Sequence, residues 1–166
     1  MGQSELVADC SRCAGLCCVA LSFDASEDFA FDKPAGVRCP NLTREGRCGI
    51  HAELRERGFR GCAAFDCHGA GQVATAAFRN ESDETIQAAF LQLKDVHRLM
   101  WLLREAAKRL PRGHDVLRIV IDLELETLET IASTRAEVLI ATDLREPERR
   151  ARALLRSVGH ALRDSN

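Results

Sequence analysis

The sequence predicts a mainly α-helical protein in which an irregular, metal-stabilised cysteine-rich region precedes a three- or four-helix bundle. The first observation is the clustering of cysteine, because all eight cysteines of the 166-residue chain lie between Cys10 and Cys67. The second is the distribution of glycine, since nine of the eleven glycines precede residue 72. The third is a helical spacing of apolar residues that begins only after residue 80. We therefore expect two regions, residues 1–79 and residues 80–166.

The first region has little regular periodicity and is expected to consist mainly of loops. Asp32 to Gly36 is typical of a turn, because proline fixes φ and glycine accepts a positive φ. Ile50 to Arg57 fits two helical turns that end at Gly58. These loops contain too few apolar groups to offset their chain entropy, so metal binding and folding should be coupled.

The second region is expected to begin with a long amphipathic helix. Ser82 or Asp83 can cap its start, and Pro111 stops it. His97 lies near its apolar stripe, which favours a core histidine over a metal ligand. The stripe consists of Ile86, Ala89, Phe90, Leu93, Val96, Leu99, Met100, Leu103, Ala107 and Leu110.

Further helices are predicted over residues 115–133 and 147–163, with a short segment over 137–141 between them. Short links between three antiparallel helices predict a small bundle. The side of 115–133 that we expect to be buried consists of Val116, Ile119, Val120, Leu123, Thr127 and Ile131. The corresponding set in 147–163 consists of Leu154, Leu155, Val158, Ala161 and Leu162.

Composition and charge disfavour several classes of function. Apolar residues make up 46% of the chain and charged residues 29%, as in an ordinary folded domain. A net charge of −2 gives no basis for nucleic-acid binding, and glutamates interrupt the arginine-rich stretch over 145–156, as on a solvated helix face. No apolar run is long enough to span a bilayer, and the start lacks the pattern of a secretory signal. We expect a cytoplasmic protein with no nucleic-acid or membrane partner.

The cysteines themselves predict a metal site. In a reducing cytosol structural disulfides are rare, and dense cysteines more often bind metal. Redox-active thiols without metal are a further interpretation. The spacing begins CxxCxxxCC, which offers several soft thiolates from one short loop. The predicted metal ligands and cofactor-binding residues are Cys10, Cys13, Cys17, Cys18, Cys39, Cys48, Cys62 and Cys67, with His51 and His68 as secondary candidates.

The residues leave the identity of the metal open. Structural zinc sites commonly show two cysteine pairs with short gaps, and here only the first cysteines obey that rule. The chain begins with cysteines separated by short gaps and has a further cysteine at a distance, which resembles the spacing of cluster-binding proteins. The dipeptide Cys39-Pro40 is also similar to one found in such proteins. An iron–sulfur cluster of the 4Fe–4S type is therefore the preferred cofactor, and zinc is the alternative. Eight thiolates suffice for two four-coordinate sites. A single centre would use four of them, and the other four would not be ligands.

Four segments carry a family resemblance: CxxCxxxCC from Cys10, Cys39-x2-Leu42, Arg47 to His51, and Gly61 to Cys67. Over about residues 9–72 the chain resembles the YkgJ-type cysteine-cluster proteins of bacteria, which implies chelation of zinc or iron. The cluster also resembles that of flagellin lysine N-methylases, which implies iron–sulfur binding. The segments similar to the N-terminal region of actinobacterial pentapeptide-repeat proteins, here without the repeats, are residues 15–21, 28–36 and 69–72.

Three hypotheses for function remain open from the sequence. The first is a redox- or metal-responsive module that acts through a protein partner. The second is a zinc-stapled structural interaction domain with no redox role. The third is a cluster-dependent enzyme or methyl-transfer accessory. Because the sequence shows no motif for a methyl donor and no catalytic residues, the non-enzymatic hypotheses are preferred.

Overall fold

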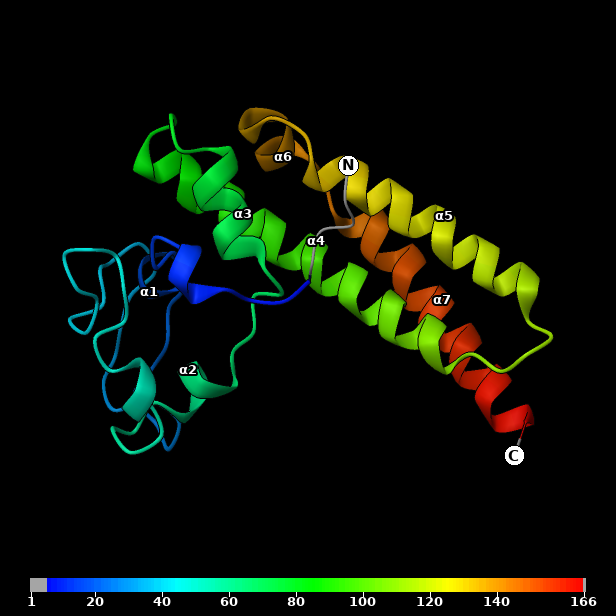
Figure 1. Ribbon diagram of the computed structural model, residues 1–166, viewed down its shortest axis with the longest axis horizontal. Helices are drawn as coiled ribbons and strands as arrows, with labels where there is room; N and C mark the ends of the chain where they lie inside the picture. The colour runs from blue at the N-terminus through cyan, green and yellow to red at the C-terminus, as the bar shows by residue number, and fades with distance from the viewer. Residues whose placement is uncertain (1–5, 166) are drawn as a thin grey trace. The chain divides into compact units, whose positions relative to one another are not determined.

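The structure, a computed structural model, describes residues 6–165 (Figure 1). It is mainly α-helical, which confirms the predicted fold class. Within these residues no helix is both long enough and apolar enough to cross a membrane. The helices are η1 (Cys10–Arg12), α1 (Cys17–Ala20), η2 (His51–Glu53), α2 (Arg60–Ala64), α3 (Ala70–Ala77), α4 (Asp83–Arg109), α5 (Asp115–Ala132), α6 (Ala136–Ala141) and α7 (Arg145–Asp164).

The chain divides into two compact units, and the division falls inside the longest helix. The first unit ends at Lys94 and the second begins at Asp95, both within α4. The sequence-based boundary lies at residues 79 and 80, before this helix starts. The first turns of α4 belong with the cysteine-rich unit because Phe90 is buried and lines a cavity of that unit.

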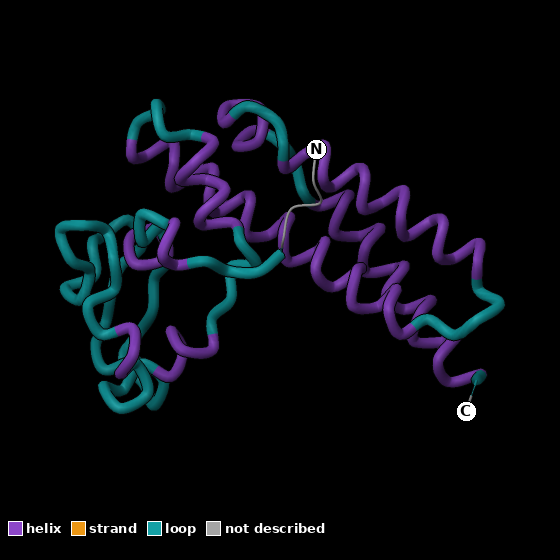
Figure 2. Tube along the Cα trace, in the orientation of Figure 1, coloured by secondary structure: helices purple, strands orange, loops and turns teal. Residues whose placement is uncertain are grey.

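Loops make up most of the first unit between α1 and α3 (Figure 2). The turn expected at Asp32 to Gly36 is present, and Gly36 has a positive φ of 74°. The expected helical turns after Ile50 form a short 3-10 helix, η2, followed by turns that end at Gly58. Isolated antiparallel bridges connect the loops at Phe23 with Lys33, Ser26 with Phe29, and Leu42 with Cys48.

Four phenylalanines of this unit form an aromatic cluster, in which Phe59 is buried and the other three are half-buried. Phe23 stacks on Phe29 with ring centroids 4.4 Å apart, and Phe31 meets Phe59 edge-on at 5.1 Å. A Cβ on Gly61 would stand only 2.1 Å from Cζ of Phe29. Glycine is therefore required at position 61, because any side chain there would displace the stacked ring.

The predicted helices of the second region are all present, and the apolar stripe of α4 is confirmed. His97 is only 1% exposed, which agrees with its expected place in the core. Ile86 and Ala107 are half-buried at the edges of the stripe. The fully buried members are Ala89, Phe90, Leu93, Val96, Leu99, Met100, Leu103 and Leu110.

The predicted buried side of α5 is wrong. Val116, Ile119, Val120 and Leu123 are instead exposed, at 77%, 58%, 42% and 57%. Thr127 is exposed as well, and Ile131 is half-buried. The residues of α5 that are buried are Ile121, Glu124 and Leu128.

The error on α5 has a physical cause, because this helix is apolar on more than one side and its spacing does not select a face. Polar contacts of the second unit fix the rotation instead. Arg118 donates hydrogen bonds to the carbonyl oxygens of Ala107 and Leu110 at the end of α4, at 2.9 and 3.2 Å. Glu124 is paired with an arginine of α7.

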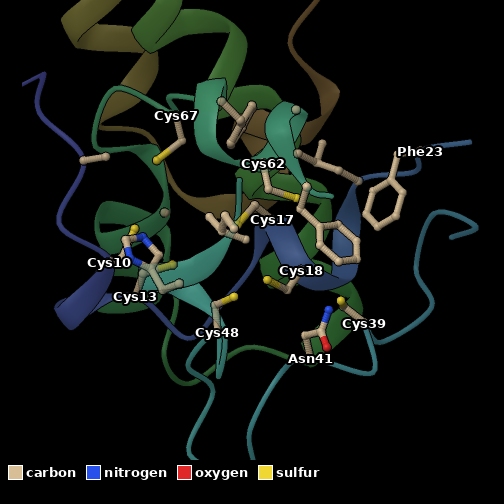
Figure 3. A pocket seen from close by; sticks show the side chains of 18 of the residues that line it. Cys10, Cys13, Cys17, Cys18, Phe23, Cys39, Asn41, Cys48, Cys62 and Cys67 are labelled. Atoms are coloured by element: carbon tan, nitrogen blue, oxygen red, sulfur yellow. The ribbon is translucent and has the colours of Figure 1, made fainter. Parts of the chain in front are cut away.

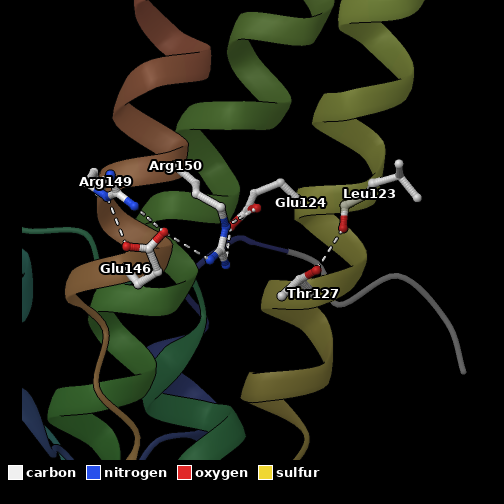
Figure 4. Close-up of polar contacts among 6 residues, drawn as sticks. All are labelled: Leu123, Glu124, Thr127, Glu146, Arg149 and Arg150. Atoms are coloured by element: carbon white, nitrogen blue, oxygen red, sulfur yellow. Dashed lines mark hydrogen bonds and ion pairs between the residues drawn. The ribbon is translucent and has the colours of Figure 1, made fainter.

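The partner of Glu124 is Arg150, which forms a two-pronged contact with the carboxylate (Figure 4). Arg150 Nε donates to Oε2 at 2.8 Å and Nη2 donates to Oε1 at 3.1 Å. The other arginines of α7 follow the expectation of a solvated face, because exposed glutamates of the same helix pair with Arg149 and Arg152.

The buried set of α7 is partly as predicted. Val158 and Ala161 are buried, and Leu154 and Leu155 are half-buried. Leu162 was expected to be buried but is 36% exposed. Because the small residue Ala151 and Pro147 are buried in the first half of α7, the buried face begins earlier in the helix than the leucine pattern indicates.

Candidate metal centre

One cavity of about 290 Å³ in the first unit is lined by every cysteine of the chain (Figure 3). In this view Cys17 and Cys62 lie in the middle of the group, with Cys10 and Cys13 toward one end and Cys39 beside Asn41 at the other. The apolar part of the lining includes Phe23, Phe29, Phe59 and Phe90. The cysteines come from separate segments of the chain: Cys10, Cys13, Cys17, Cys18, Cys39, Cys48, Cys62 and Cys67.

The first cysteine loop is fixed to α3 by two polar side chains of that helix. Gln72 accepts a hydrogen bond from the Asp9 backbone N–H at 3.0 Å and donates to the Val7 carbonyl at 2.8 Å. Thr75 Oγ1 accepts from the Ala14 N–H at 3.1 Å. These bonds cross more than sixty residues of sequence and hold the loop that carries Cys10 and Cys13 against the start of α3.

The close approach of Cys13 and Cys67 depends on a glycine in the first turn of α3. A Cβ on Gly71 would stand 2.7 Å from Cys13 Sγ and 3.6 Å from Cys67 Sγ. The backbone N–H groups of Gly69 and Gly71 also act on Cys67 and favour its ionised form. Glycine at 71 therefore leaves room for Cys13 Sγ at the positive end of a helix, whereas Cys67 Sγ would be at ordinary contact distance from a side chain there.

The remaining cysteines are positioned by the loops and short helices of the unit. Cys17 and Cys18 open α1, and the Cys18 carbonyl accepts from the Cys39 N–H at 2.9 Å. Cys48 is placed by its bridge with Leu42. Cys62 lies on α2, directly after Gly61.

The electrostatic neighbours of the sulfur atoms fall into two groups. Cys10 interacts with Cys13, Cys17 and Cys67, which form one group at the start of α3. Cys62 interacts with Cys17, Cys39 and Cys48, so Cys17 belongs to both neighbourhoods.

The cavity disfavours free thiolates. Burial is the main factor that raises the pKa of Cys10 and of Cys67, and it raises the pKa of Cys62 to about 11. A hydrogen bond with Cys18, together with burial, raises the pKa of Cys17. Reactive cysteines have lowered pKa values, so the environment does not fit a thiol nucleophile that works without a cation.

None of the eight cysteines forms a disulfide. Among residues 6–165, no group of three or more histidine, cysteine, aspartate or glutamate side chains is arranged so that it could hold a metal ion. The structure thus brings all eight predicted ligands to one cavity without the tight geometry of a single-ion site.

The two secondary histidine candidates occupy different places. His51 is among the residues that line the cavity. His68 is not in the described lining of the cavity, and its Nδ1 lies 3.7 Å from Oδ1 of Asp66. Of the two, only His51 is therefore placed where it could face a bound group.

Lys33 lies in the turn expected at Asp32 to Gly36, and the sequence did not predict that it is buried. It is 3% exposed, and Cys17, Cys18, Cys39 and Cys62 all act on its ammonium group. Burial lowers the pKa of Lys33, and these four sulfurs oppose that change when they are ionised. The sequence signal was limited to a lysine in a predicted turn, where exposure is the ordinary expectation.

Comparison with known proteins finds a relative in Bacillus subtilis (strain 168), the uncharacterized protein YybG, which is 44% identical over 110 residues. The match covers 61% of this chain and 39% of the relative. The chain therefore spans about two fifths of the length of the curated relative it matches. No family model matches the chain, and no solved structure matches it. The chemistry of the cysteines has to be inferred from their arrangement.

Proposed function

We propose that the cysteine-rich unit binds an iron–sulfur centre of the 4Fe–4S type through its thiolates and acts as a redox- or metal-responsive module. The observation that carries the proposal is the convergence of all eight cysteines on one cavity of about 290 Å³. Sulfur ligands in this number select iron–sulfur clusters, zinc or Cu(I) over hard metal ions.

The distribution of the cysteines around the cavity favours a cluster over a single zinc ion. Thiolates around tetrahedral zinc lie ~2.3 Å from the metal and therefore ~3.8 Å from one another. No group of three or more ligand-type side chains within residues 6–165 is arranged in that way. A cluster of several iron and sulfide atoms keeps its thiolates farther apart, which suits sulfur atoms spread around a cavity.

The two groups of sulfur atoms bear on the number of centres. Cys17 and Cys18 are adjacent in sequence, so one can serve each group. This division supports two centres, each with four thiolates. One would use Cys10, Cys13, Cys17 and Cys67, and the other Cys18, Cys39, Cys48 and Cys62.

Metal analysis of protein purified without oxygen tests the proposal. We expect brown protein with about four irons and about four sulfides per chain for one 4Fe–4S cluster, and about twice that for two. Colourless protein with stoichiometric zinc would support the zinc-stapled alternative. Protein that contains neither metal after reconstitution with iron and sulfide, or with zinc, would contradict metal binding altogether.

Variants separate one centre from two. Cys67→Ser and Cys62→Ser each alter a different group, so each should lose about half of the iron if two centres form. If one centre forms, each variant should lose either all of the iron or none of it. His68→Asn is the matched control, because it lies next to Cys67 but outside the described cavity lining, and asparagine accepts the positive φ of 48° at this position.

A further inference from the structure

Lys33 is held in the interior of the first unit by three backbone carbonyl groups. Its Nζ donates to the carbonyl oxygens of Val19, Pro34 and Val37 at 3.0, 3.1 and 2.8 Å. The residue is 3% exposed, so the ammonium group has almost no contact with solvent. Its three hydrogens are satisfied by the carbonyl groups, but these neutral groups do not balance its charge.

The titratable groups that act on Lys33 are cysteines of the cavity. Cys39, Cys18, Cys17 and Cys62 act on its ammonium group, in that order of strength. The ring of Phe23, whose centroid lies 5.8 Å from Nζ, adds a weaker attraction. Within residues 6–165, no carboxylate forms an ion pair with this lysine.

A buried ammonium without a carboxylate partner is unfavourable unless another negative charge balances it. Neutral thiols do not supply this charge. A metal centre ligated by four thiolates does, because an iron–sulfur cluster or a zinc ion with four thiolates carries net negative charge. The lysine and such a centre would each reduce the cost of burying the other.

We propose, on the basis of the function proposed above, that Lys33 is the counter-ion of an anionic metal centre at the end of the cavity that carries Cys18, Cys39 and Cys62, and that it raises the reduction potential of that centre. Reduction adds one electron to the cluster, supplied by an external one-electron reductant, with no bond to Lys33 and no proton transfer. The added negative charge is favoured by a fixed positive charge nearby.

The two ends of the cavity differ in the source of their positive potential. Near Cys67 it comes from the backbone N–H groups of Gly69 and Gly71. Near Cys39 it comes from a full side-chain charge on Lys33. If two clusters form, the one near Lys33 should therefore be reduced first, and only its potential should depend strongly on residue 33.

Anaerobic potentiometric titration of the full chain loaded with iron and sulfide tests this inference. Lys33→Gln keeps hydrogen-bond donors but removes the charge, and Lys33→Arg keeps the charge. We expect Lys33→Gln to lower the equilibrium constant for reduction at least tenfold, which is about 59 mV for one electron. Lys33→Arg should change it less. The control is Arg12→Gln, an exposed residue of η1 next to Cys13, whose effect should be small and should diminish in high salt.

The outcomes separate this inference from the proposed function. If wild-type protein binds no metal, the proposed function fails. If wild-type protein holds a cluster but Lys33→Gln has an unchanged potential, only the role of Lys33 is overturned. Loss of the centre in Lys33→Gln with retention in Lys33→Arg supports the role of the charge, whereas loss in both assigns Lys33 a purely structural role. If the centre contains zinc, competition with a chelator replaces the titration, and Lys33→Gln should lower zinc affinity at least tenfold.

Discussion

The two units of this protein are organised by different physical principles. In the second unit, long helices bury apolar side chains such as Met100, Leu103 and Ile121, and the buried Glu124 pairs with the half-buried Arg150 of α7. In the first unit, the cysteine loops surround a cavity and are connected by isolated bridges and side-chain-to-backbone hydrogen bonds. The helical second unit can fold from hydrophobic burial alone. The cysteine loops contain a cavity where a core would be, so they depend on what fills it.

The largest expected difference between the units is their response to metal removal. After treatment of the loaded full chain with a strong chelator, we expect the cysteine loops to lose protection from amide hydrogen exchange. Helices α5 and α7 should keep theirs. Structural zinc sites contribute about 10–16 kcal/mol to folding, which is ample to decide whether such loops are ordered. Hydrogen exchange followed by mass spectrometry measures both units in one experiment, and equal loss in both would contradict the comparison.

The second difference concerns pH. The thiol of Cys62, with a pKa raised to about 11, and the other cavity thiols with raised values are protonated at neutral pH and must lose protons to bind metal. Metal affinity should therefore rise with pH, by up to about tenfold per pH unit for each thiolate ligand. Cobalt(II) titrations followed by visible absorption at several pH values measure this slope, and a flat profile would contradict thiolate ligation.

The metal-free protein should show the opposite trend. A thiol whose pKa is higher in the folded state than in the unfolded state stabilises the fold while it is protonated. For Cys62 this contribution is complete below its ordinary value of 9.0 and is lost as pH rises toward about 11. Denaturation of the metal-free chain should therefore show the first unit weakening in alkali. The second unit, which contains no cysteine, has no such contribution.

The third prediction compares two residues of α5 and tests which face of this helix is buried. Ile121→Ala should lower the free energy of unfolding by about 2–5 kcal/mol, because it creates a cavity at a side chain that is 0% exposed. Ile119→Ala, two residues away and 58% exposed, should cost less than about 0.5 kcal/mol. Urea denaturation followed by circular dichroism measures both. Equal losses would show that α5 is rotated relative to the structure.

The smallest effect is expected from a matched pair of glycines. Gly71→Ala places a methyl group 2.7 Å from Cys13 Sγ and should cost about 1–3 kcal/mol, with weaker metal retention. Gly159→Ala lies within α7, where the nearest atom is 3.7 Å from the new Cβ, and should stabilise the second unit by up to about 1 kcal/mol. Thermal denaturation and metal content of both variants check the pair. A neutral Gly71→Ala would show that Cys13 and Cys67 do not need this close approach.

Much of the fold could be predicted because the helical spacing in α4 is unambiguous. This helix is apolar on one side, and the residues of that side from Ala89 to Leu103 are buried as expected. The same method failed on α5, where apolar residues surround the helix and the buried face depends on Glu124 and its partner Arg150. That pair joins residues 26 positions apart, and no local pattern predicts such a contact.

The division into a cysteine-rich part and a helical part could be predicted from the sequence, because composition and periodicity are local properties. The sequence also predicted the eight candidate ligands, since clustered soft sulfur donors are typical of metal sites. The tertiary structure was needed to show that all eight line one cavity, that Gly71 leaves room for Cys13 Sγ, and that Lys33 is buried where four of the cysteines act on its ammonium group. These facts depend on contacts between residues distant in the chain, which are fixed by packing rather than by neighbours in sequence.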